Sequence, residues 1–143
     1  MKVNNRILAG ALISLAVLFI GAALVQGADE KGIAITNANF VAPSPEKENL
    51  IDEWVEISNQ GSENVSLADW TLEDAQNHTY AFPDFSLKAG GVVKIRTGIG
   101  NDTSEDLFWN RSSSIWNNDG DVATLRDASG NLVSSYPEET KAA

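Results

Sequence analysis

The chain has 143 residues, a formal net charge of −10 and no cysteine. This length suits one domain with a modest core. The lack of cysteine excludes disulfides, thiol catalysis and zinc–thiolate sites. From Asp29 onward the chain has eight Lys and Arg against 20 Asp and Glu, a net charge of −12. A surface this acidic repels phosphate backbones, so we expect no nucleic-acid partner. Solubility is the simplest explanation of the acidity, and binding of a divalent cation or a cationic partner is the other.

Residues 1–28 differ in composition from the rest of the chain. Lys2 and Arg6 precede residues 7–25, a run without any charged side chain. Such a run predicts a hydrophobic helix that serves as an export signal or as a membrane anchor. Gly27 offers a small residue for cleavage, and both alternatives stay open. Both place residues 29–143 outside the cytoplasm, because the positive end of such a segment tends to stay inside. The protein would then be secreted, or anchored to the outer face of the cytoplasmic membrane through residues 7–25.

Short alternating segments separated by turn residues fill residues 29–143. In the clearest one, WVEISN, Val55 and Ile57 point to one face and Trp54 and Glu56 to the other. No long helical pattern follows residue 29, so we predict an all-β sandwich of about eight or nine short strands. We expect these strands within residues 32–41, 50–59, 65–67, 70–74, 79–83, 91–98, 107–109, 122–125 and 132–136.

Aromatic residues lie in or beside these segments. Their usual role is to fill a core, and stacking against a sugar is the functional alternative. We expect core positions for Trp70, Tyr80, Phe82, Trp109, Trp116 and Tyr136.

Three stretches in a fixed order resemble the lamin tail domain family: EWVEISNQGSENVSLADWTLED, HTYAFPDFSLKAGGVVKIRTGIG and WNNDGDVATLRDASGNLV. The resemblance runs from about residue 32 to residue 136. It implies an immunoglobulin-like β-sandwich that acts as an interaction module. Asp69 stands where the family often has a glycine before the tryptophan. The chain shows no coiled-coil rod, nuclear localisation run or prenylation box, so it is similar to the stand-alone lamin tail proteins that bacteria and archaea export.

The WNNDGD stretch has two interpretations. Asn117, Asp119 and Gly120 favour a tight turn, and Asp121 can accept hydrogen bonds from backbone amides where the next strand starts. Alternatively, the oxygens of Asn117, Asp119 and Asp121 alternate as ligands do in calcium loops. The glycine position and the missing twelfth-position glutamate exclude an EF-hand, but a looser calcium site stays open, helped by Asp102, Glu105 or Asp106. We expect no other cofactor.

The sequence offers little for catalysis. His78 is the single histidine, and it lies at a turn where a surface histidine is ordinary. Acid–base chemistry needs two carboxyl groups that face one dry cleft. We expect most acids to be solvated in turns or on outward strand faces, so we predict a non-enzymatic domain. The candidate pairs are Glu53 with Glu56, Glu73 with Asp74, and Asp119 with Asp121.

Together these features predict an exported, non-catalytic module that binds protein or envelope partners at the cell surface. A calcium-dependent adhesion module is the first alternative, and an accessory domain of a small hydrolase is the second. Residues 42–49 and 98–106 are the candidate binding loops by composition. Four N-x-Ser/Thr sequences fall in or beside predicted loops and predict glycosylation at Asn64, Asn77, Asn101 and Asn110.

Overall fold

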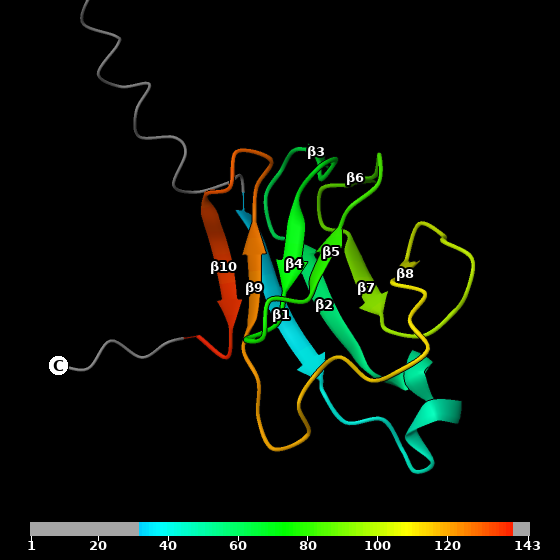
Figure 1. Ribbon diagram of the computed structural model, residues 1–143. Coiled ribbons are helices and arrows are strands. Elements are labelled where there is room, and N and C mark those ends of the chain that lie inside the picture. Colours follow the sequence, from blue (N-terminus) through cyan, green and yellow to red (C-terminus); the bar gives the residue numbers. More distant parts are fainter. Residues whose placement is uncertain (1–31, 139–143) are drawn as a thin grey trace, which may run out of the picture.

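The computed structural model describes residues 32–138, which form two four-stranded β-sheets packed face to face (Figure 1). In order across the first sheet lie β1 (Ile33–Asn39), β2 (Trp54–Asn59), β7 (Val92–Arg96) and β8 (Asp106–Phe108). The second sheet has the order β10 (Leu132–Tyr136), β9 (Ala123–Arg126), β4 (Thr71–Glu73) and β5 (Thr79–Ala81). A separate pair consists of β3 (Val65–Ser66) and β6 (Ser86–Leu87). The predicted all-β sandwich is therefore confirmed for this part of the chain.

The hydrophobic helix predicted within residues 1–28 lies outside the described residues, as does any membrane contact through residues 7–25. Within residues 32–138, no helix has the length and apolar character needed to cross a bilayer.

The core forms where alternating side chains of the two sheets meet. Along β2, Val55 and Ile57 are fully buried and their neighbours are partly exposed, as the sequence pattern predicts. Across the sandwich, Leu72 of β4 and Leu125 of β9 are also fully buried and belong to the same apolar cluster. Because the side-chain period of a strand is two residues, this alternation fixes which face of each strand turns inward.

Two local predictions differ from the structure. Residues 50–52 do not extend β2 but form a 3₁₀ turn, η4 (Leu50–Asp52), which follows a similar turn, η3 (Glu46–Glu48). Antiparallel pairing of β1 with β2 starts only at Trp54, opposite Asn39, because the chain first has to reverse direction. The two-residue strand β6 was also not predicted, because two residues are too few to show a period.

Asp69 occupies the position where the family often has glycine. Its φ angle is +66°, in the left-handed region that glycine adopts most easily. The next residue, Trp70, is buried, and its backbone nitrogen donates to the Leu67 carbonyl. The turn therefore keeps a glycine-like conformation with an aspartate, and the fold is retained.

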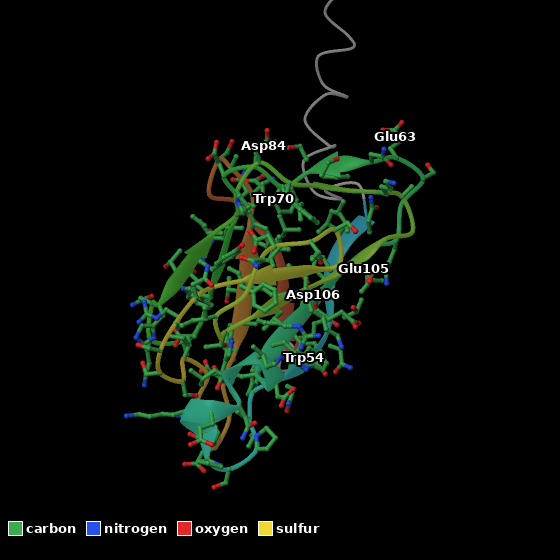
Figure 2. All side chains as sticks on the ribbon, turned by 90° about the vertical axis from the view of Figure 1, so that its right-hand side faces the viewer. Trp54, Glu63, Trp70, Asp84, Glu105 and Asp106 are labelled. Carbon is green, nitrogen blue, oxygen red and sulfur yellow. The ribbon has the colours of Figure 1, made fainter. Side chains whose placement is uncertain are left out.

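The sheets also meet at their outer strands. β1 and β10 lie side by side at one edge of the sandwich (Figure 1), where the Ile35 backbone nitrogen donates to Ser134 Oγ at 3.0 Å. At the opposite edge, β8 runs parallel to β7, and the loop at residues 97–105 connects them. Figure 2 looks onto this edge, with Glu105 and Asp106 labelled. On the outer face of the same sheet, Lys94 Nζ lies 4.0 Å from the centre of the Trp54 ring.

Candidate functional site

Glu53 is a carboxylate at the end of η4 that has no exposed surface. Its Oε1 accepts hydrogen bonds from the backbone nitrogens of Ile115 at 3.0 Å and Trp116 at 3.2 Å. Thr97 Oγ1 donates to the same oxygen at 2.8 Å, and Ser114 Oγ donates to Oε2. These four hydrogen bonds satisfy the buried carboxyl group and join the segment of Glu53 to those of Thr97 and residues 114–116. The expectation that most of the acids would be solvated is therefore wrong for Glu53.

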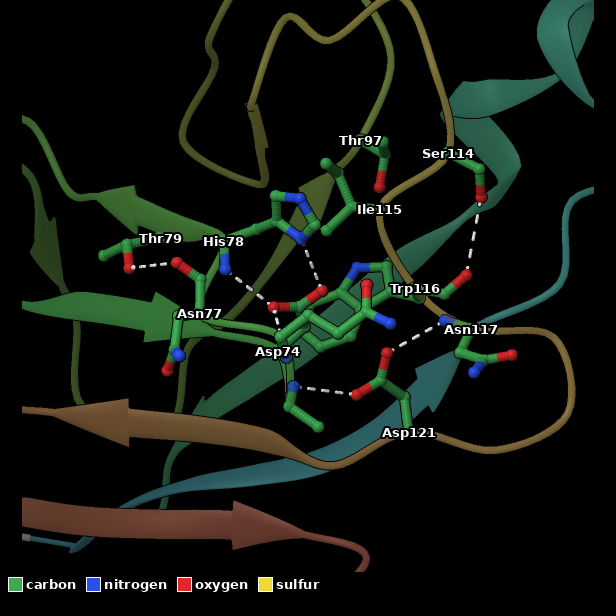
Figure 3. A network of polar contacts seen from close by, with 12 residues as sticks. Asp74, Asn77, His78, Thr79, Thr97, Ser114, Ile115, Trp116, Asn117 and Asp121 are labelled. Atoms are coloured by element: carbon green, nitrogen blue, oxygen red, sulfur yellow. Dashed lines mark hydrogen bonds and ion pairs between the residues drawn. The ribbon is translucent and has the colours of Figure 1, made fainter.

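Asp121 is the carboxylate of the WNNDGD stretch, and it is 9% exposed. Its Oδ2 accepts from the Asn117 backbone nitrogen at 2.8 Å, and its Oδ1 accepts from those of Ala75 and Val122 at 2.9 Å and 2.8 Å. Figure 3 shows the bonds that Asp121 receives from the turn and from the neighbouring chain segment. Asp121 thus closes the turn and ties it to the loop after β4. The prediction that Asp121 bonds backbone amides at the strand start is confirmed, and the prediction of a solvated carboxylate is wrong here too.

Other groups of the WNNDGD stretch also form hydrogen bonds within the turn. Asn117 Oδ1 accepts from the Asp119 backbone nitrogen at 3.0 Å, and the Gly120 nitrogen donates to the Asn117 carbonyl at 3.1 Å. Trp116 is 2% exposed and belongs to the core cluster, as predicted, and it anchors the turn to the core. Of the three calcium candidates, Asn117 and Asp121 are therefore occupied by backbone donors, and Asp119 is exposed. In residues 32–138, no three His, Cys, Asp or Glu side chains are grouped so that they could hold a metal ion.

Asp74 and His78 form a dyad in the turn between β4 and β5. The Asp74 side chain is fully buried, and its Oδ2 lies 2.7 Å from Nδ1 of His78, which is half-exposed. Asp74 Oδ1 also accepts from the backbone nitrogens of Gln76 and His78 (Figure 3). Nucleophilic catalysis would need a hydroxyl donating to the other ring nitrogen. Among the described residues, no hydroxyl donates to it. The three bonds that Asp74 accepts brace the turn. Asp74 is a third exception to the expected solvation.

The predicted acid pairs are not brought together at one cleft. Glu53 is buried, whereas Glu56 lies on the outer sheet face and accepts from Thr36 Oγ1 at 2.9 Å. Glu73 pairs with Arg126 at 3.0 Å on one face of β4, and Asp74 turns to the interior. Residues an odd number of positions apart along a strand point to opposite sides, which separates these two pairs. In the third pair, Asp119 is exposed, whereas both carboxylate oxygens of Asp121 accept backbone N–H groups.

A row of aromatic rings runs through the same region. The ring centres of Phe40 and Trp116 are 5.0 Å apart, those of Trp116 and Trp109 are 6.2 Å apart, and those of Trp109 and Tyr80 are 5.7 Å apart. Burial raises the pKa of the Tyr80 phenol well above 10, and the negative charge of Asp102 adds to this effect. The predicted core role is confirmed for Trp116 and Tyr80, as it is for Trp70 and Phe82.

The predicted glycosylation positions are all exposed, although two have structural roles. Asn64 Oδ1 accepts from the Ala89 backbone nitrogen, and Asn110 Oδ1 accepts from that of Gly100. No bond from the side-chain amides of Asn77 and Asn101 to another described residue is present, and glycosylation stays a prediction at all four positions.

In a comparison with known proteins, the chain matches a protein-family model. The family model described as Lamin Tail Domain matches residues 26–139. No curated protein matches the sequence.

Proposed function

The chain belongs to the lamin tail domain family, whose immunoglobulin-like fold is an interaction module, and we propose that it acts as a non-catalytic binding domain exposed at the cell surface. The observation that carries this proposal is the use of its buried carboxylates. Glu53, Asp74 and Asp121 each accept backbone N–H groups and thereby hold loops in place. Carboxylates that accept backbone N–H groups make the loops around them rigid. Rigid loops favour binding because they lose little conformational entropy when a partner binds.

The proposed location outside the cytoplasm rests on the apolar run at residues 7–25 behind Lys2 and Arg6. The proposed partner is a protein or another component of the envelope. The net charge of −12 from residue 29 onward argues against a nucleic-acid partner. No described feature favours calcium-dependent adhesion or an accessory role in hydrolysis over simple binding.

A membrane-impermeant, amine-reactive crosslinker applied to intact cells of the source organism tests both parts of the proposal. Lys47 and Lys88 are exposed and would react with it. We expect the full chain to be modified in intact cells and to form a discrete adduct of higher mass with a partner. Modification only after lysis would contradict export. Modification in intact cells without any adduct, at several crosslinker lengths, would contradict a binding role.

A further inference from the structure

At one end of the sandwich, η3, η4 and the loop after β7 come together (Figure 1). A hollow with mixed polar and apolar lining lies there. Its volume is about 280 Å³, and its lining includes Ile51 and Ile99. These two side chains are 46% and 71% exposed. A single exposed aliphatic residue is ordinary on a protein surface. Two of them at one hollow, between the two loops singled out by composition, form a surface that we name the Ile51–Ile99 surface.

The backbone that presents Ile99 is fixed on both sides. The Gly98 nitrogen donates to the Leu50 carbonyl at 3.2 Å, and the Gly100 nitrogen donates to Asn110 Oδ1 at 3.1 Å. A Cβ atom at Gly98 would lie 2.8 Å from the Ile51 nitrogen, and one at Gly100 would overlap the Phe108 ring. Only glycine allows the chain to pack this closely. Ile99 is therefore held outward by a rigid loop, which favours binding because the loop has little freedom to lose.

The charges around this surface are unusual for so acidic a domain. Residues 32–138 contain six Lys and Arg against 17 Asp and Glu, a net charge of −11. Three of the six basic side chains have a partner: Arg96 pairs with Asp106, Arg126 with Glu73, and Lys94 lies over Trp54.

Two of the other three basic side chains, Lys47 and Arg111, line the hollow. Both are exposed, and neither forms an ion pair with another described residue. Glu48 also lines the hollow, which leaves an excess of one positive charge there. A hollow that presents two exposed aliphatic side chains and two unpaired cations is complementary to a ligand that carries both an aliphatic group and a negative charge.

On the basis of the function proposed above, we propose that the Ile51–Ile99 surface docks a peptide segment of another protein that carries an aliphatic side chain next to an aspartate or glutamate. The aliphatic side chain would enter the hollow, and the carboxylate would lie between Lys47 and Arg111. An anionic membrane would face the whole domain with its net charge of −11, whereas a peptide meets only this surface. The hollow and Ile33, the first residue of β1, lie at opposite ends of the sandwich.

The test is photo-crosslinking in intact cells with the full chain, with a benzophenone amino acid in place of Ile99 and, in a matched control, in place of Leu132. Leu132 is 61% exposed but lies on β10, away from this surface. We expect a protein adduct from position 99 whose mapped attachment site has an Asp or Glu within a few residues. Arg111→Glu should reduce this adduct by roughly tenfold, as expected when an exposed charge contact becomes repulsive. Lys88→Glu, on another part of the surface, should leave it unchanged.

The alternatives have distinct outcomes. An adduct with lipid, or an adduct that Arg111→Glu does not weaken, would overturn the peptide proposal. An adduct from position 132 but none from position 99 would also overturn it, while the binding function would stand. If neither photo-crosslinking position gives an adduct, and the amine-reactive crosslinker gives none either, the peptide proposal and the binding function would both be contradicted. An unchanged thermal unfolding midpoint of each variant shows that the loss of an adduct is not a loss of fold.

Discussion

Oε1 of Glu53 lies 3.0 Å from the backbone nitrogen of Ile115, and this contact joins the start of β2 to a segment 62 residues further along the chain. The same oxygen receives the neighbouring nitrogen of Trp116. The aromatic anchor of the WNNDGD turn is thus positioned by a carboxylate that comes 63 residues earlier in the chain.

Replacement of Glu53 by glutamine should be strongly destabilising. The amide keeps the shape of the side chain, but its NH₂ group would face a donor where the carboxylate oxygen now accepts. We expect the free energy of unfolding to fall by about 2–4 kcal/mol. Urea denaturation of residues 29–143, which contain the whole core cluster, measures it. Glu56→Gln is the matched control because Glu56 lies on the outer face, and its effect should be within about 1 kcal/mol. Equal effects of the two changes would contradict the role assigned to Glu53.

Within WNNDGD, the two aspartates should differ sharply. Asp121→Ala leaves three backbone nitrogens without their acceptor, and we expect it to lower the free energy of unfolding by about 2–3 kcal/mol. Asp119→Ala removes an exposed side chain and should cost at most about 0.5 kcal/mol. The same denaturation experiment compares them, and a larger effect at Asp119 would mean that its carboxylate has a partner in solution.

Calcium should not stabilise the domain. Both carboxylate oxygens of Asp121 and the side-chain oxygen of Asn117 already accept backbone N–H groups, so binding would first have to break those bonds. We expect the same thermal unfolding midpoint for residues 29–143 in millimolar calcium and in EDTA. A ligand that binds the folded state raises this midpoint by linkage. A clear rise that disappears in Asp119→Ala would restore the calcium-dependent adhesion hypothesis.

Asp69 adopts a conformation that favours glycine, so its replacement should show how much free energy the positive φ angle costs the folded state. We expect Asp69→Gly to raise the free energy of unfolding by about 0.5 kcal/mol, because relief of the left-handed strain exceeds the added backbone entropy. Asp69→Ala should lower it by about 1 kcal/mol, because alanine adopts a positive φ less readily than aspartate does. The thermal midpoints should follow the order Gly, Asp, Ala. An alanine variant as stable as the glycine variant would show that the turn rearranges.

Tyr80 should make the domain sensitive to alkali. Its pKa is raised in the folded state above the ordinary value of 10.0, so the folded protein holds this proton more tightly than the unfolded chain does. The resulting stability is complete below pH 10 and is lost as the pH rises above that value. When the pH is raised from neutral to about pH 11, the free energy of unfolding should therefore fall less in the Tyr80→Phe variant than in the unaltered domain. Urea denaturation at both pH values measures the difference, and an equal loss in the two proteins would contradict a buried phenol.

Much of the fold was predictable because the signals that specify it are local. Alternation along WVEISN places Val55 and Ile57 in the core whatever the partner strand is, and Asn117 and Gly120 favour a turn in any context. The start of β2 was less predictable, because Leu50 and Ile51 continue an apolar pattern through a turn that only the pairing of Asn39 with Trp54 reveals.

The sequence by itself thus determined the all-β class, the inward faces of the strands and the turn at WNNDGD, since each depends on residues within a few positions of one another. It also carried the family resemblance, which depends on the order of three stretches along the chain. Only the tertiary structure decided what the carboxylates do. A glutamate in a short segment looks the same whether solvent or backbone N–H groups surround it. The donors to Glu53 come from around residue 115, and one donor to Asp121 comes from Ala75, so their burial depends on contacts between segments far apart in the chain. The Ile51–Ile99 surface has the same origin, because the turns before β2 and the loop after β7 form it together.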